Sequence, residues 1–596
     1  MHGATPLSDS TTLFRLWAPR ASAVDLAVGG RTVPMTAGAD GWFELTAPAG
    51  HGDRYGYHLD GGPLRPDPAS RWLPDGVHEM AAVLDPATFA WTDSGFAAAP
   101  ITTAVVYELH VGTFTPEGTF AAAIDHLDAL VDLGITHVEV MPVNAFDGQH
   151  NWGYDGVAWW AVHEGYGGPG GLASFVDVCH ARGLAVVLDV VHNHLGPSGN
   201  YLADFGPYLV EDAESTWGKI VNIDGPNSGA VREFILGSAL AWLRDLHIDA
   251  LRLDAVHALV DRSATHLLAE LSDRVAVLSE AVGRPLQLIA ETDRNDPQTI
   301  RPRALGGQGI DAQWADDLHH AIHGAVTGEA DGYYADYADP LAAVAAAYER
   351  GLVYDGSRFS GFRGRVVGAP LPPDVSSRQL VACIQNHDQV GNRPAGDRLT
   401  TLVEPDLVRV AIALLCLAPH TPMLFMGEEY GETTPFQFFT DMPGEDLRQA
   451  IRDGRRREFE YFSSWAGEVP DPLAPATFAR SKLDHSAAGT PEGQQRRALW
   501  RDLLALRRTE PALGNGRRDL VAVQRTGPVL VITRRPPAGA WPAAAVVATA
   551  NLGTTPVAGP DGPLLLSTAD PRYGGLQPPE NGEVRARSVA VHRAPI

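Results

Sequence analysis

GLASFVDVCHARGLAVVLDVVHNH, residues 171–194, contains the pattern that decides the fold of this chain. Its first half has the apolar spacing of a helix, and Gly183 predicts the end of that helix. A continuously apolar run follows and finishes in polar residues. Strands that are covered by helices are apolar on both faces, so this run predicts one strand of a parallel sheet.

The same order of helix, glycine and apolar run recurs through the middle of the chain. In residues 120–143, Ile124, Leu127, Leu130 and Val131 have helical spacing before Gly134, and residues 231–256 again place a helical pattern before an apolar run. About eight apolar runs are candidate strands: VVYELH from 105, THVEVMPV from 136, AVVLDVVHNH from 185, IDALRLDAV from 248, LQLIAET from 286, DAQWAD from 311, LVACIQNHD from 380 and TPMLFMGEE from 421. Eight strands alternating with helices predict a (β/α)8 TIM-type barrel over residues 103–495.

The segments on either side of this barrel have a different character. Residues 1–95 contain short strand-like pieces such as FRLWAPRA and GWFELTAP, separated by Gly, Pro and Asp. They predict an N-terminal β-sandwich. Residues 498–596 contain further runs, among them VLVITRR and AAVVATANLG, which predict a C-terminal β-domain.

Composition narrows the classes of partner and compartment. The chain has 596 residues and a formal net charge of −26, which disfavours nucleic acid and anionic membranes as partners. Its start, MHGATPLSDSTT, has no basic segment followed by an apolar core, so we expect a cytoplasmic protein without a signal peptide. Cys179, Cys383 and Cys416 each lie among apolar residues, which predicts buried thiols.

Two short motifs raise the question of a cofactor. GGPGG at 167–171 is glycine-rich, but no basic residue follows it, which argues against a phosphate site. HNH at 192–194 has a superficial metal-ligand spacing, so a catalytic metal stays an alternative, although no third histidine is placed to help. We therefore expect catalysis without a metal or an organic cofactor.

Polar residues follow almost every predicted strand. In IDALRLDAVHAL, residues 248–259, Arg252 and Asp254 share one strand face, although burying charges is unfavourable unless they are paired or used. The other polar residues at strand ends are His110, Asp189, His194, Glu291, Asp316, His387, Asp388, Glu428 and Glu429. The carboxyl ends of barrel strands form one rim, where active sites lie, so these residues predict a catalytic cleft.

Three of these carboxylates favour glycosidase chemistry. Asp254, Glu291 and Asp388 follow the fourth, fifth and seventh predicted strands. Arg252 could pair with Asp254 and keep it ionised. An ionised Asp beside a Glu of raised pKa is the nucleophile and acid/base pair of retaining glycosidases, with carboxylates roughly 5–6 Å apart.

Other side chains at the same rim suit a sugar. His194 and His387 could hold sugar hydroxyl groups. Trp152, Tyr154 and Trp314 offer flat faces on which sugar rings could stack. A non-catalytic glucan-binding protein on the same fold is the alternative from another class.

Four motifs then resemble the conserved segments of the α-amylase superfamily, in the family order: DVVHNH (189–194), LRLDAVH (251–257), IAET (289–292) and QNHDQ (385–389). The resemblance implies that Asp254 is the nucleophile, Glu291 the acid/base and Asp388 the carboxylate that stabilises the transition state. It assigns contacts with the substrate to Tyr154, His194, Arg252 and His387, and we expect His257 and Gln389 to contact the substrate as well.

Longer segments are similar to one family within that superfamily, the maltooligosyltrehalose trehalohydrolases: DAQWADDLHHAIHG, NHDQVGNRPAGDRL and FMGEEYGETTPFQFFTD. The resemblance implies hydrolysis of the α-1,4 bond next to a terminal trehalose unit, on a substrate made by a separate maltooligosyltrehalose-forming enzyme. We expect at least one of Asp316, Asp317 and His319, after the sixth strand, to contact the trehalose unit. A glycogen-branching transferase is the alternative within the superfamily.

Overall fold

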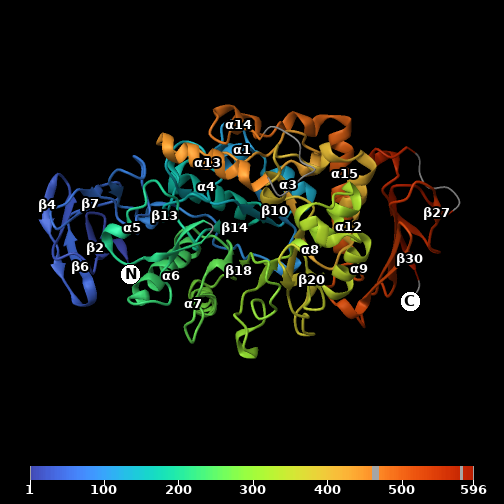
Figure 1. Ribbon diagram of the computed structural model, residues 1–596, viewed down its shortest axis with the longest axis horizontal. Coiled ribbons are helices and arrows are strands. Elements are labelled where there is room, and N and C mark those ends of the chain that lie inside the picture. Colours follow the sequence, from blue (N-terminus) through green and yellow to red (C-terminus); the bar gives the residue numbers. More distant parts are fainter. Residues whose placement is uncertain (1, 216, 460–468, 577–581, 595–596) are drawn as a thin grey trace.

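The computed structural model describes residues 2–215, 217–459, 469–576 and 582–594. Figure 1 shows a barrel wrapped by helices in the centre, the N-terminal sheets at one end and the C-terminal sheet at the other. This architecture confirms the predicted fold class.

The barrel is closed by eight parallel strands that are hydrogen-bonded in sequence order. They are β10 (Val106–Leu109), β11 (His137–Val140), β14 (Ala185–Val190), β17 (Ala250–Leu253), β18 (Gln287–Ala290), β19 (Ala312–Trp314), β22 (Leu380–Cys383) and β23 (Thr421–Phe425). β23 pairs with β10 and closes the ring. Every residue of these strands is buried, and each strand lies within one of the predicted apolar runs.

Helices connect the strands, and glycines end several of them as predicted. The helix predicted before Gly134 is two helices, α2 (Phe120–Ile124) and α3 (Leu127–Leu133). Gly134 adopts a left-handed conformation, and its N–H caps the end of α3. Val131 is 39% exposed, so its helical spacing did not place it on the buried face.

The other helices have these bounds: α1 (Val111–Phe114), α4 (Gly168–Ala181), α5 (Leu202–Phe205), α6 (Ser228–Asp245), α7 (Leu267–Val282), α8 (Asp316–Thr327), α9 (Pro340–Arg350), α10 (His387–Gly391), α11 (Leu399–Leu402), α12 (Pro405–Leu417), α13 (Glu445–Glu458), α14 (Pro475–Arg480) and α15 (Pro491–Thr509). α12 and β23 form the predicted pair of buried helix and buried strand. No helix in the described part of the chain is both long and apolar enough to cross a membrane. The three cysteines are buried thiols, as predicted.

Two antiparallel sheets form the N-terminal region. One contains β1 (Gly3–Ser8), β2 (Thr11–Trp17), β6 (Trp42–Ala47) and β5 (Thr36–Ala37). The other contains β4 (Arg31–Pro34), β3 (Val24–Val28), β7 (Arg54–Leu59) and β8 (Leu64–Arg65), with β9 (Ala81–Ala82) paired to β7. Ion pairs Arg65–Asp204 and Arg71–Asp245, both 2.7 Å, join this region to the barrel.

The C-terminal region is a five-stranded antiparallel sheet that packs beside α9, α12 and α15 (Figure 1). Its strands are β24 (Val521–Thr526), β25 (Val529–Arg534), β26 (Ala545–Asn551), β30 (Ser588–Ala594) and β28 (Leu564–Ser567). The predicted runs VLVITRR and AAVVATANLG contain β25 and β26. α15 spans the predicted boundary between the two domains.

Three buried arginines hold this sheet against the barrel: Arg378, Arg507 of α15 and Arg534 of β25. In the described ranges none of the three forms an ion pair with a carboxylate. Their guanidinium groups donate instead to the backbone carbonyls of Cys416, Leu417, Ala418, His420, Leu513 and Asn515. Four of these six carbonyls lie in the last turn of α12 or just after it, where the helix dipole is negative, so the backbone supplies the opposing charge.

Candidate active site

Arg252 forms the floor of the cleft at the end of β17. Its side chain is fully buried, and Nη1 donates to Asp189 Oδ2 at 2.7 Å and to Asp254 Oδ1 at 2.9 Å. Its Nη2 lies 3.6 Å from Glu291 Oε2. The predicted pairing of Arg252 with Asp254 is therefore present, and the buried charges are compensated by one another.

Asp254 has a second donor from the loop that follows β14. Asn193 Nδ2 donates to Asp254 Oδ2 at 2.8 Å, and also to the backbone carbonyl of Asp254. With Arg252 on Oδ1, both oxygens of this carboxylate accept hydrogen bonds. Two such donors fix the orientation of the carboxylate.

Glu291 is oriented by an unusual backbone conformation next to Asp254. Ala255 has φ 39° and ψ 51°, a left-handed conformation that is uncommon for a residue other than glycine. This conformation directs the Ala255 N–H to Glu291 Oε2 at 2.5 Å. Burial raises the pKa of Glu291 to about 8, and the nearby carboxylates of Asp254 and Asp388 add to this shift, although Arg252 opposes it. Glu291 therefore holds a proton at neutral pH.

His387 connects the cleft to a carboxylate inside the barrel. Its Nδ1 lies 2.5 Å from Glu108 Oε1, and its backbone N–H donates to Glu108 Oε2 at 2.9 Å. Burial alone would lower the pKa of His387, but Glu108 and Asp388 raise it to about 9. His387 is therefore a cation, and its Nε2 lies 3.5 Å from Asp388 Oδ1.

Asp388 stands on the first turn of α10 with 41% of its side chain exposed. It accepts a hydrogen bond from Asn392 Nδ2 at 3.2 Å. Asn386 caps the helix by accepting from the Gln389 N–H. This cap fixes Asp388 at the cleft with an open face toward solvent.

Tyr154 is the one predicted aromatic platform that faces the cleft. Its ring stacks on His387 at 5.1 Å, and its hydroxyl donates to Asp189 Oδ2 at 2.6 Å. Trp152 is buried and stacks on Phe436, and Trp314 is buried beneath the Arg252 guanidinium at 4.2 Å. The prediction that these two tryptophans offer faces to sugar rings was wrong, because protein covers them.

His194 and His257 lie along one side of the cleft. His194 Nε2 is 2.9 Å from the Tyr154 carbonyl, and its ring stacks on Trp217 at 6.2 Å. His257 lies 6.0 Å from the same tryptophan. Trp217, 46% exposed, follows β15 (Leu209–Ser215) and is an aromatic wall that the sequence analysis did not identify.

A cavity of about 200 Å³ opens beside Asp388, where β18 and β19 end. Its lining is polar and aromatic: Asp293, Asp316, His320, Tyr333, Asp336, Tyr337, Tyr354, Phe362, Arg363, Asp388, Gln389 and Asn392. Burial and the neighbouring carboxylates of Asp388, Asp317 and Asp293 raise the pKa of Asp316 to about 7. The predicted residues Asp316 and Gln389 therefore share one cavity with Asp388.

Asp317 and His319 do not line this cavity. Both Asp317 oxygens accept hydrogen bonds from protein: Oδ1 from Tyr337, and Oδ2 from Asn295, the Val353 N–H and the Tyr354 N–H. His319 is 2% exposed and packs against His320, His323 and Tyr334. Because α8 begins at Asp316, successive residues point in different directions, and the expectation of sugar contact is corrected for these two.

Some rim residues serve the fold, and others were missed. The ring nitrogens of His110 lie within hydrogen-bonding distance of Thr113 and the Asn151 carbonyl, while Glu428 accepts from the Phe425 N–H. Sequence reasoning missed Glu108 and Asn193, although Glu108 shows the same signal as Arg252, a charge inside an apolar strand. Glu108 lies within β10 and not after its end, so a search of strand ends does not find it.

The HNH motif does not form a metal site. His192 packs on Trp159, and burial lowers its pKa to about 4, whereas His194 points to the Tyr154 carbonyl. Among the residues described, no group of three or more His, Cys, Asp or Glu side chains has metal-binding geometry. The two histidines thus have separate structural surroundings.

Two family models match the chain. The alpha amylase catalytic domain matches residues 84–212. Carbohydrate-binding module 48 (isoamylase N-terminal domain) matches residues 2–75.

Whole-chain relatives point the same way. Malto-oligosyltrehalose trehalohydrolase of Arthrobacter ramosus is 54% identical over 84% of this chain and 87% of that protein. The protein of that name from Mycobacterium tuberculosis (strain ATCC 25618 / H37Rv) is 46% identical over 98% of this chain and 99% of its own. A crystal structure of a putative alpha amylase from Salmonella typhimurium superposes with a TM-score of 0.90 at 39% identity, covering 100% of this chain and 99% of that one.

Proposed function

Because this chain belongs to the malto-oligosyltrehalose trehalohydrolases, glycoside hydrolases of the α-amylase family, we propose that Asp254, Glu291 and Asp388 hydrolyse maltooligosyltrehalose. The bond cleaved is the α-1,4 bond between the glucan and its terminal trehalose unit. The products are α,α-trehalose and a shortened maltooligosaccharide. A separate enzyme that builds the trehalose linkage at the end of a maltooligosaccharide would supply the substrate.

The single observation that carries this proposal is that two neighbouring carboxyl groups, those of Asp254 and Glu291, have different surroundings. Asp254 accepts hydrogen bonds from Arg252 and Asn193, whereas burial and neighbouring anions raise the pKa of Glu291 to about 8. Retaining glycosidases need this difference between nucleophile and acid.

The reaction then proceeds in two steps. Asp254 attacks the anomeric carbon of the glucosyl unit, and Glu291 transfers its proton to the departing oxygen of trehalose. Glu291, now ionised, takes a proton from water, and the oxygen of that water displaces Asp254 from the anomeric carbon. Asp388 and the His387 cation hold the sugar hydroxyls as positive charge develops on the ring.

The cavity beside Asp388 is the proposed site of the trehalose unit. The leaving group must lie next to Glu291, and Asp293 of this cavity follows Glu291 by two residues. Trehalose is neutral and rich in hydroxyl groups, so hydrogen bonds to Asp293 and Asp316 and contact with Tyr333 and Phe362 suit it.

A digest of maltotriosyltrehalose tests this function. We expect free trehalose, together with maltotriose whose new reducing end is first seen as the α-anomer in NMR spectra of fresh digests. New branch points on amylose would indicate a branching transferase, and an unchanged substrate would indicate a binding protein. A β-anomer would contradict the retaining mechanism.

Replacing Asp316 by Ala tests the trehalose cavity. Loss of a charge-assisted hydrogen bond should lower kcat/KM for maltooligosyltrehalose by roughly 2 kcal/mol, about 30-fold, and affect plain maltooligosaccharide less. Asp317→Asn is the matched control, because its oxygens bind only protein groups and its loss should appear as a lower Tm. If Asp316→Ala lowered kcat/KM equally on both substrates, Asp316 would not be a residue that recognises the trehalose unit.

A further inference from the structure

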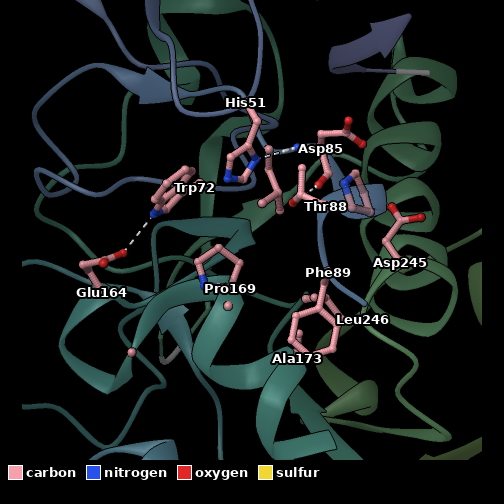
Figure 2. A pocket seen from close by; sticks show the side chains of 14 residues that line it. His51, Trp72, Asp85, Thr88, Phe89, Glu164, Pro169, Ala173, Asp245 and Leu246 are labelled. Carbon is pink, nitrogen blue, oxygen red and sulfur yellow. Dashed lines mark hydrogen bonds between the residues drawn. The ribbon is translucent and has the colours of Figure 1, made fainter. Parts of the chain in front are cut away.

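A second cavity, of about 250 Å³, lies where the N-terminal sheets, the following linker and the barrel helices meet (Figure 2). The N-terminal region contributes His51 and Trp72, and the linker contributes Leu84, Asp85, Pro86, Thr88 and Phe89. The barrel contributes Glu164, the first half of α4 and the end of α6 at Asp245 and Leu246. None of these residues belongs to the catalytic cleft.

The cavity combines apolar walls with hydrogen-bonding groups. Trp72, Leu84, Phe89, Pro169 and Leu246 form the apolar surface, and Figure 2 shows Trp72 and Phe89 on different sides of Pro169. Such a lining, with a few polar groups at fixed positions, is typical of small-molecule sites. The aromatic and aliphatic walls suit the C–H faces of a ligand.

The polar groups are held in place by protein contacts that leave one atom of each available. Trp72 Nε1 donates to Glu164 Oε2 at 3.0 Å, so Glu164 Oε1 can accept from a ligand. The Asp85 N–H donates to His51 Nδ1 at 3.2 Å. Because Nδ1 accepts, neutral His51 carries its proton on Nε2 and can donate it. One acceptor and one donor thus border the same apolar space.

Charge excludes several ligand classes. The lining contains no Lys or Arg, so nothing in it attracts a phosphate or another anion. Asp245 is already neutralised by Arg71 at 2.7 Å and Arg244 at 2.6 Å. A neutral ligand with apolar faces and hydroxyl edges therefore fits this lining better than an anion does, and the carboxylates of Asp85 and Glu164 make a cation the competing ligand.

We propose that this cavity binds a glucosyl unit of an α-glucan chain at a site separate from the catalytic cleft. The site goes beyond hydrolysis, because it would hold substrate without cleaving it. The matched carbohydrate-binding module ends at residue 75, so only His51 and Trp72 come from it. The site therefore exists only when the module, the linker and the barrel are assembled.

The test uses the full chain with Asp254→Asn, so that the ligand is not consumed. Calorimetric titration with maltoheptaose is expected to show two binding events, and Trp72→Ala should weaken one of them by at least about tenfold. Trp541→Ala is the matched control, since Trp541 is 88% exposed in the C-terminal domain. Glu164→Gln is a second variant that removes an acceptor without removing a large side chain.

Each outcome decides the proposal. Loss of one binding event in both Trp72→Ala and Glu164→Gln, with unchanged Tm for Glu164→Gln, supports it. One binding event in the parent, or two that survive both substitutions, overturns it. Saturation by tetramethylammonium that blocks maltoheptaose would identify a cation site and would also overturn it. Cleavage of maltotriosyltrehalose by Glu164→Gln with Asp254 intact should match the parent, which keeps this test separate from that of the catalytic function.

Discussion

Asp254→Asn is expected to lower kcat by at least about a thousandfold while the enzyme still binds its substrate. The amide has nearly the same shape as the carboxylate, but it cannot form the covalent bond to the anomeric carbon. Its oxygen can still accept from Arg252, which is now left with less opposing charge. Rates of trehalose release and calorimetric titration with maltotriosyltrehalose measure the two effects separately.

The control for this substitution is the Tm of the Asp254→Asn variant, compared with that of the parent. Arg252 keeps its bond to Asp189 in the variant, so the barrel floor should hold and Tm should change little. Activity within tenfold of the parent would show that Asp254 is not the nucleophile. A large fall in Tm would assign the loss to the floor of the cleft and not to the chemistry.

Glu291→Gln is expected to lower kcat/KM by about 10²–10⁴-fold and to change its pH dependence. Glu291 must be protonated in the first step, and its pKa is about 8. In the parent, kcat/KM should therefore fall as pH rises through about 8, because the acid form is lost. The glutamine carries no titrating proton, so this alkaline limb should disappear.

A substrate with a leaving group that needs no proton separates acid catalysis from positioning. α-Maltosyl fluoride releases fluoride, so Glu291→Gln should lose much less of the first step on it than on maltooligosyltrehalose. Equal losses on both substrates would mean that Glu291 shapes the cleft without acting as the acid. An alkaline limb that persists in the variant would assign that pKa to another group, with His387 the first to examine.

The sequence predicted the barrel well because burial on both faces leaves a clear signal in each strand. All eight runs became strands, including the short DAQWAD run, which contains β19. The catalytic carboxylates were predictable for a related reason. Asp254 and Glu291 follow apolar strands, and the carboxyl ends of those strands meet at one rim.

The wrong predictions concern the directions in which side chains point, which the order of residues along the chain does not determine. Asp316 and Asp317 are adjacent in sequence, yet one lines the cavity and the other binds the backbone of Val353 and Tyr354. Trp314 was expected to face sugar, but the guanidinium of Arg252 covers it. The contact of Glu108 in β10 with His387 at the start of α10 joins segments far apart in the chain, so no local pattern could reveal it.

The second cavity could not be predicted from the sequence either. Its walls come from the N-terminal region, the linker and two barrel helices, and each piece alone resembles an ordinary surface segment. The motif GGPGG was examined only as a phosphate site. In the structure Gly167, Pro169 and Gly170 line this uncharged wall instead.

Two of the arginines that join the C-terminal sheet to the barrel are synthesised after all the barrel strands. β23, the last barrel strand, leaves the ribosome well before Arg507 and Arg534. Until these two arrive, the carbonyls that follow α12 lack the donors that bind them in the finished protein. Domains at the start of a chain usually fold first during synthesis, but the contacts of Arg507 and Arg534 with the end of α12 can form only after these two residues have been made. A chain truncated before Arg534 would lack the donor that binds the Leu417 carbonyl at the end of α12.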